Sequence, residues 1–139
     1  MSKPFLIIQL RPEDETADNE FEAIKFYGGL EDNEIARERV ESKGVPNINL
    51  DEFAAIIVGG SPLNVSTPEK EKSAIQREIE LGFYNLFEDI VARDFPFLGC
   101  CSGNGLLGSY CGSTISTKYA EPVGGADVFL TEAGRQDPL

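Results

Sequence analysis

The stretch "FPFLGCCSGNGLLG" (residues 95–108) joins a short apolar run to a glycine-rich segment that contains two adjacent cysteines. An apolar run of this length is typical of a buried strand, and the residues after it suit a helix that starts near Gly103. Two similar runs come earlier, "PFLIIQL" (4–10) and "AAIIVGG" (54–60). Continuous apolar runs, as opposed to alternating ones, indicate strands of a parallel sheet that is covered on both faces.

Helical periodicity separates these runs. A first helix is predicted over residues 14–27, because apolar side chains recur there at helical spacing and Gly28–Gly29 follow as a stop signal. For a second helix, Thr67 is the expected N-cap and Pro68 the expected first residue. Its apolar stripe comprises Ile75, Ile79, Phe83, Leu86 and Ile90. Weaker strands are predicted at 36–40 and 126–131, so strands and helices alternate as they do in α/β proteins.

Composition limits the classes of partner. The 139 residues carry a formal net charge of −12, which disfavours a nucleic-acid surface and an anionic membrane surface. We see neither a membrane span nor a signal peptide, so we expect a cytoplasmic protein. Histidine is absent and the three cysteines lack a C-x-x-C spacing, so no zinc site is predicted. The acidic residues 13–20 are interpreted as a solvated helix face.

The glycine-rich segment fits two kinds of site. Gly103, Gly105 and Gly108 spell G-x-G-x-x-G, and Glu121 follows Gly103 by eighteen residues, close to the spacing of a ribose-binding acid. However, the helix after these glycines would have only about eight residues before 111–112, too few for the usual crossover helix of that fingerprint. The fingerprint also normally occupies the first strand–helix turn of its domain. We therefore expect no dinucleotide and no other cofactor.

The second interpretation is a nucleophile elbow, G-x-C-x-G, formed by Gly99, Cys101 and Gly103. A nucleophile on a sharp strand-to-helix turn needs small neighbours on both sides, because the strained backbone leaves no room for Cβ atoms. The thiol of Cys101 would lie at a helix N-terminus, where the dipole favours the thiolate. The N–H of Ser102 would face the carbonyl under attack, and the loop after the Gly-Gly strand supplies Gly60 and Ser61 as further donors.

These motifs resemble those of class I (triad-type) glutamine amidotransferases, of the GMP-synthase-like glutaminase kind. "FPFLGCCSG" is similar to their P-x-L-G-x-C-x-G segment, and "IIVGGSP" is similar to their oxyanion strand. The resemblance implies a flavodoxin-like three-layer sandwich with a mostly parallel central sheet. It implies Cys101 as nucleophile, Gly60 and Ser102 as oxyanion hole, and L-glutamine as substrate. The released ammonia would pass to a synthetase domain or subunit.

The chain departs from that family in two respects. Gly105 occupies the place where the family usually has glutamine, and the His-x-Glu pair that activates the cysteine is missing. We therefore interpret residues 1–139 as one amidotransferase-like domain that is incomplete at its C-terminus and inactive alone. Two alternatives stay open: another cysteine-elbow protein of the DJ-1/PfpI type, or a non-catalytic domain that binds a partner. An acidic residue near the elbow, from the first strand–helix loop, would favour the DJ-1/PfpI type.

Overall fold

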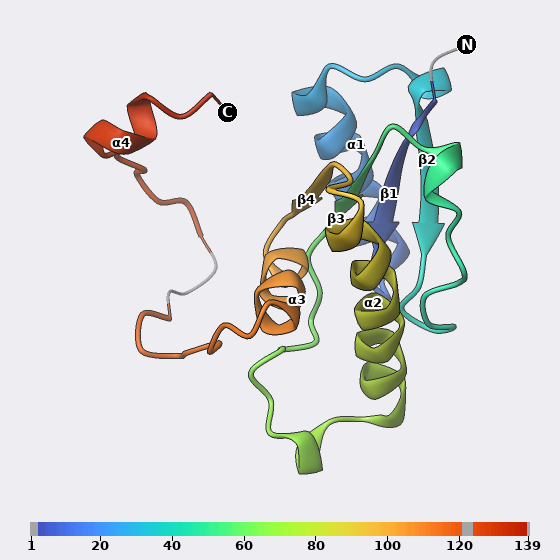
Figure 1. The fold of residues 1–139 in the computed structure, drawn as a ribbon, viewed down its shortest axis with the longest axis vertical. Coiled ribbons are helices and arrows are strands. Elements are labelled where there is room, and N and C mark those ends of the chain that lie inside the picture. Colours follow the sequence, from blue (N-terminus) through green and yellow to red (C-terminus); the bar gives the residue numbers. More distant parts are fainter. Residues whose placement is uncertain (1–2, 121–123, 139) are drawn as a thin grey trace.

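Four parallel strands form the sheet that organises this protein (Figure 1). The computed structural model describes residues 3–120 and 124–138, so Glu121 lies outside the described residues. The strands are β1 (Phe5–Gln9), β2 (Ile35–Arg39), β3 (Ala55–Val58) and β4 (Phe97–Gly99), in the spatial order β2-β1-β3-β4. This order and the parallel pairing confirm the predicted flavodoxin-like α/β fold.

Alternate side chains of each strand point to opposite faces of the sheet, and the register aligns those of neighbouring strands. Ile7 of β1 pairs with Arg37 of β2 on one side and with Ile57 of β3 on the other. These three residues share one face, because side chains of neighbouring strands in register point the same way. Their sequence neighbours, such as Ile8 and Val58, face the opposite layer and are fully buried.

Helices cover both faces, which makes three layers. Helix α1 (Asp14–Gly28) packs on the face of Gln9, whose amide donates to the carbonyl of Ala17 at 2.7 Å. Helices α2 (Ala74–Ala92) and α3 (Ser102–Tyr110) lie on the other face (Figure 1). There the apolar stripe of α2 meets the strands in one cluster, which includes Leu6, Ile8, Leu10, Ile56, Val58, Ile79, Phe83, Leu86, Phe87, Ile90 and Leu106.

The predicted helix signals were right for α1 and wrong for the start of α2. Helix α1 ends at Gly29 in a left-handed conformation with φ 61°, which a glycine adopts without strain. Helix α2 does not begin at Thr67–Pro68, because a short 3₁₀ turn (Glu69–Glu71) follows these residues. Its N-cap is Ser73, whose hydroxyl accepts the backbone N–H of Gln76 at 3.2 Å.

The predicted strand at 126–131 is absent from the described residues 124–131. Residues 124–131 are followed by a short helix, α4 (Glu132–Arg135) (Figure 1). Val128 and Phe129 are 84% and 86% exposed. A strand is stable only when its backbone pairs with a sheet edge, and an apolar pattern alone does not provide that partner.

Candidate functional site

Cys101 occupies a strained turn between β4 and α3. Its backbone angles are φ 53° and ψ −105°, outside the regions that a residue with a side chain prefers. Among the described non-glycine residues, only Asp94 also has a positive φ. Such a conformation costs on the order of 1–3 kcal/mol and persists only where the surroundings impose it. A sharp, strained turn between a strand and a helix is also the setting of a nucleophile elbow.

Two glycines make the turn possible by allowing close approaches. A Cβ atom on Gly99 would lie 2.5 Å from the backbone nitrogen of Asn104, in the first turn of α3. A Cβ atom on Gly103 would lie 2.8 Å from the carbonyl oxygen of Val58 in β3. Both distances are far below normal contact, and both partners are backbone atoms. The sequence G-x-C-x-G therefore lets α3 start directly against the end of the sheet.

The two adjacent thiols have different surroundings. Cys101 is exposed at the N-terminal end of α3, whereas Cys100 is only partly exposed. Burial raises the pKa of the Cys100 thiol, and the charge of Glu20 raises that pKa further. Cys100 is thereby held in the protonated, weakly nucleophilic form. Cys101 is the more exposed thiol of this pair.

A pocket of about 330 Å³ opens beside Cys101. The loop after β3 forms one wall, and the hydroxyl of Ser102 joins that loop to the elbow by donating to the carbonyl of Ser61 at 3.4 Å. Gly105, which replaces the family's usual glutamine, also lies on the pocket wall. The lining consists of Ser61, Pro62, Leu63, Asn64, Val65, Cys101, Ser102, Gly105 and Ile115. Apart from the thiol, this lining carries no ionisable side chain.

Gly60, a predicted oxyanion donor, already has a partner in this structure. Its N–H donates to the carboxylate of Glu20 at 2.9 Å, although the two residues are 40 positions apart. The N–H groups of Ser61 and Ser102 have no hydrogen-bond partner within the described part of the chain. Both residues border the pocket. The donors that remain open beside Cys101 are therefore those of Ser61 and Ser102.

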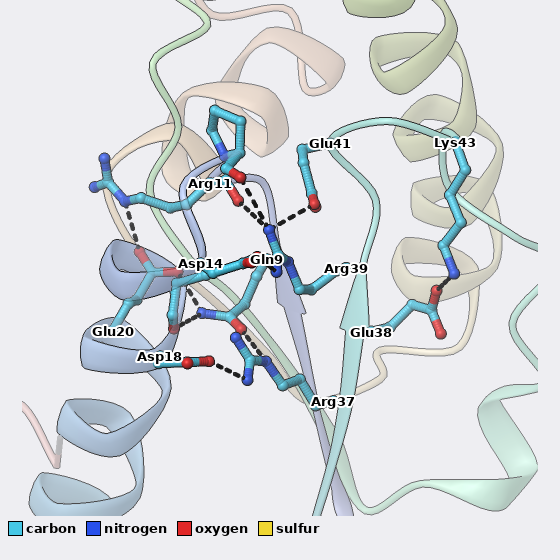
Figure 2. A network of polar contacts seen from close by, with 12 residues as sticks. Gln9, Arg11, Asp14, Asp18, Glu20, Arg37, Glu38, Arg39, Glu41 and Lys43 are labelled. Carbon is cyan, nitrogen blue, oxygen red and sulfur yellow. Dashed lines mark hydrogen bonds and ion pairs between the residues drawn. The ribbon is translucent and has the colours of Figure 1, made fainter.

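Glu20 connects the elbow region to a polar network on α1 (Figure 2). Its carboxylate accepts the side-chain amide of Gln9 at 3.0 Å and the Nε–H of Arg11 at 3.3 Å. The side chain is only 16% exposed. The interpretation of residues 13–20 as a solvated face is therefore wrong for Glu20. Sequence reasoning missed Glu20 and Arg11, although Arg11 follows the end of β1, where ligands of parallel sheets usually bind.

The rest of the network joins α1 to the edge strand β2. Arg37 donates to the side-chain oxygen of Gln9 at 2.5 Å and to Asp18 at 2.7 Å. Arg39 pairs with Asp14 and, at 2.8 Å, with Glu41. The pairs Arg37–Asp18 and Arg39–Asp14 join arginines of β2 to carboxylates of α1, so they hold α1 on the sheet.

Fold and site together define a class: a flavodoxin-like α/β domain with an accessible cysteine on a strained strand–helix turn. Comparisons with protein families, with curated proteins and with solved structures found no match. No helix within the described ranges combines the length and the apolarity that crossing a membrane requires. The particular activity therefore has to be argued from the site itself.

Proposed function

We propose that this chain is the nucleophile-bearing domain of a glutamine amidotransferase and that Cys101 forms a thioester with the side-chain carbonyl of glutamine. The single observation that carries the proposal is the backbone of Cys101, at φ 53° and ψ −105° beside an open pocket. Strain of this kind at an exposed nucleophile is typical of elbow enzymes. A buried structural cysteine would have no need of it.

The chemistry proceeds by acyl transfer. The thiolate of Cys101 attacks the amide carbon, the carbonyl electrons move to oxygen, and the C–N bond then breaks to release ammonia. Water hydrolyses the thioester to glutamate and restores the thiol. The N–H groups of Ser61 and Ser102 stabilise the oxyanion. Gly60 joins them only when Glu20 releases its N–H.

In the proposed mechanism a histidine from outside these 139 residues transfers the proton, since the chain has no histidine of its own. Departing ammonia needs a proton, and such general acid–base help is worth about 10²–10⁴-fold in rate. We expect negligible glutaminase activity from this chain alone. We also expect activity when a segment or subunit that carries the His-x-Glu pair is present, and its loss when that histidine becomes alanine. Ammonia release from glutamine measures all three cases; full activity of the 139-residue chain alone would overturn the proposed mechanism.

The assignment of the nucleophile is tested separately by alkylation. L-2-amino-5-chloro-4-oxopentanoate is a chloroketone that mimics glutamine and reacts with thiolates. We expect it to label Cys101 well before Cys100 or Cys111, and Cys101→Ser to abolish the fast labelling. Peptide mapping that finds Cys100 labelled first would refute the role of Cys101.

Three free cysteines support a reducing, cytoplasmic location. In that setting the ammonia would pass to a synthetase domain or subunit, as the resemblance to amidotransferases implies. Binding of nucleic acid is not expected from a chain with a net charge of −12.

Glu20 favours a second candidate, an enzyme of the DJ-1/PfpI type. The carboxylate lies beside the elbow region, although it comes from α1 and not from the first strand–helix loop, and its charge acts on Cys100. If the carboxylate serves the nucleophile, Glu20→Gln will change the pH dependence of alkylation at Cys101. An unchanged profile at Cys101 favours the amidotransferase.

A further inference from the structure

The topology reverses between β1 and β3. The strand order β2-β1-β3-β4 means that the chain reverses its direction of winding between these two strands. Helix α1 follows β1 on one face of the sheet, and α2 follows β3 on the other (Figure 1). In open parallel sheets, ligands bind beyond the carboxyl ends of the strands at such a reversal. The residues at these ends include Arg11 after β1 and Gly60 after β3.

Arg11 lies against Gly60 beyond the carboxyl ends of β1 and β3. Its Nε–H donates to Glu20 Oε2 at 3.3 Å, and the same oxygen accepts the N–H of Gly60 at 2.9 Å. A Cβ atom on residue 60 would lie 2.5 Å from Nη2 of Arg11. Glycine at position 60 therefore leaves room for the guanidinium of Arg11. Glu20 fixes this guanidinium by accepting its Nε–H.

The terminal nitrogens of Arg11, Nη1 and Nη2, form an open edge of the guanidinium, which is free to bind a ligand. Nη1 and Nη2 of Arg11 make no hydrogen bond within the described part of the chain, and Figure 2 shows them directed away from the network. The side chain is 31% exposed. Arg37 and Arg39, in contrast, use terminal nitrogens to bind Asp18 and Asp14. An open pair of terminal N–H groups matches the two oxygens of a carboxylate.

The guanidinium of Arg11 lies against Gly60, the residue that precedes the pocket wall. Arg11 contacts Gly60, and the next residue, Ser61, lines the pocket together with Cys101. The pocket lining has no ionisable side chain except the thiol. A charged head group on a substrate would find no partner inside the pocket, because burying an unpaired charge is costly. Arg11, which lies against Gly60 one residue before the pocket wall, is a cation suited to that role.

We infer that Arg11 binds the carboxylate of an amide substrate whose amide carbon lies at Cys101. The inference rests on the proposed function and adds to it the residue that recognises the free carboxylate of glutamine. Glu20 is then a positioning residue, which orients the guanidinium so that the open edge faces the ligand.

The test compares two electrophiles that differ only in the carboxylate. The chloroketone L-2-amino-5-chloro-4-oxopentanoate carries a free carboxylate, and its methyl ester does not. With either reagent the thiolate forms an S–C bond as the C–Cl bond breaks and chloride leaves. We expect the wild-type chain to be labelled at Cys101 faster by the acid than by the ester. Arg11→Gln should slow labelling by the acid roughly ten- to hundred-fold and leave the ester within about twofold.

Two further variants distinguish carboxylate binding by Arg11 from an effect of net charge, and a folding check accompanies them. Arg93→Gln removes the same charge at a distant position. Arg93 follows α2 and pairs with Asp51 near the amino ends of the strands, whereas Arg11 lies beyond the carboxyl end of β1. It should leave both rates unchanged. Arg11→Lys keeps the charge without the paired N–H groups and should give an intermediate rate with the acid. Circular dichroism checks that every variant is folded.

The outcomes distinguish the two proposals. If Arg11→Gln leaves the acid rate unchanged, or slows acid and ester equally, Arg11 is not the carboxylate site, and the role of Cys101 stands. If neither reagent labels Cys101 ahead of Cys100, both the proposed function and the carboxylate site are wrong.

Discussion

Replacing Gly103 with alanine measures how closely α3 packs on the sheet. The new Cβ would lie 2.8 Å from the carbonyl oxygen and 2.9 Å from the Cβ of Val58. Favourable contacts between heavy atoms lie at about 3.5–4.0 Å, so the helix or the strand has to move by more than half an ångström. Val58 belongs to β3, which pairs with a strand on each side, so the helix is the part that shifts.

The matched control is Gly108→Ala in the same helix. A Cβ atom there would first meet a side-chain carbon of Ile115 at 3.6 Å, an ordinary contact. Both substitutions gain helix propensity, up to about 1 kcal/mol each relative to glycine. Only Gly103→Ala adds overpacking, at about 1–3 kcal/mol. The two variants should therefore differ by about 1–3 kcal/mol in free energy of unfolding, with Gly103→Ala the less stable.

Urea denaturation followed by circular dichroism measures this difference. With a slope of roughly 1–3 kcal/mol per molar urea, the two midpoints should be separated by about 1 M. Because the shifted helix carries Ser102 and the elbow, alkylation of Cys101 should change in Gly103→Ala and stay constant in Gly108→Ala. Equal midpoints for the two variants would refute the close approach of α3 to β3 and, with it, the explanation of the G-x-C-x-G pattern.

Two more predictions concern Cys100 and the C-terminal segment. Because burial and the charge of Glu20 raise the pKa of Cys100, its alkylation by iodoacetamide should rise only above the pH range of an ordinary thiol. Glu20→Gln should shift this profile to lower pH; an unshifted profile would contradict the electrostatic contribution. Chymotrypsin should cleave first after Tyr119 and Phe129, both more than 80% exposed, and leave the sheet intact. Earlier cleavage at the buried Phe83 in α2 would speak against this.

Local patterns were sufficient for most of the fold. Strand runs and helical stripes are short-range signals, and they predicted β1 to β4, α1 and the buried face of α2. The glycine spacing around Cys101 also predicted a sharp turn, because only a residue without Cβ tolerates the approaches at 99 and 103. The start of α2 was predicted wrongly, because Ser73, and not Thr67, caps this helix.

The surroundings of the site depended on contacts between distant parts of the chain. Nothing in the acidic run 13–20 distinguishes Glu20 from its neighbours, yet Glu20 alone in that run accepts the N–H of Gly60. The sequence by itself therefore predicted the sharp turn at Cys101, whose cause is steric and local. Tertiary structure decided which N–H groups stay open and where Arg11 points. The reason is that hydrogen bonds between residues 9 to 40 positions apart form only after the helices are packed on the sheet.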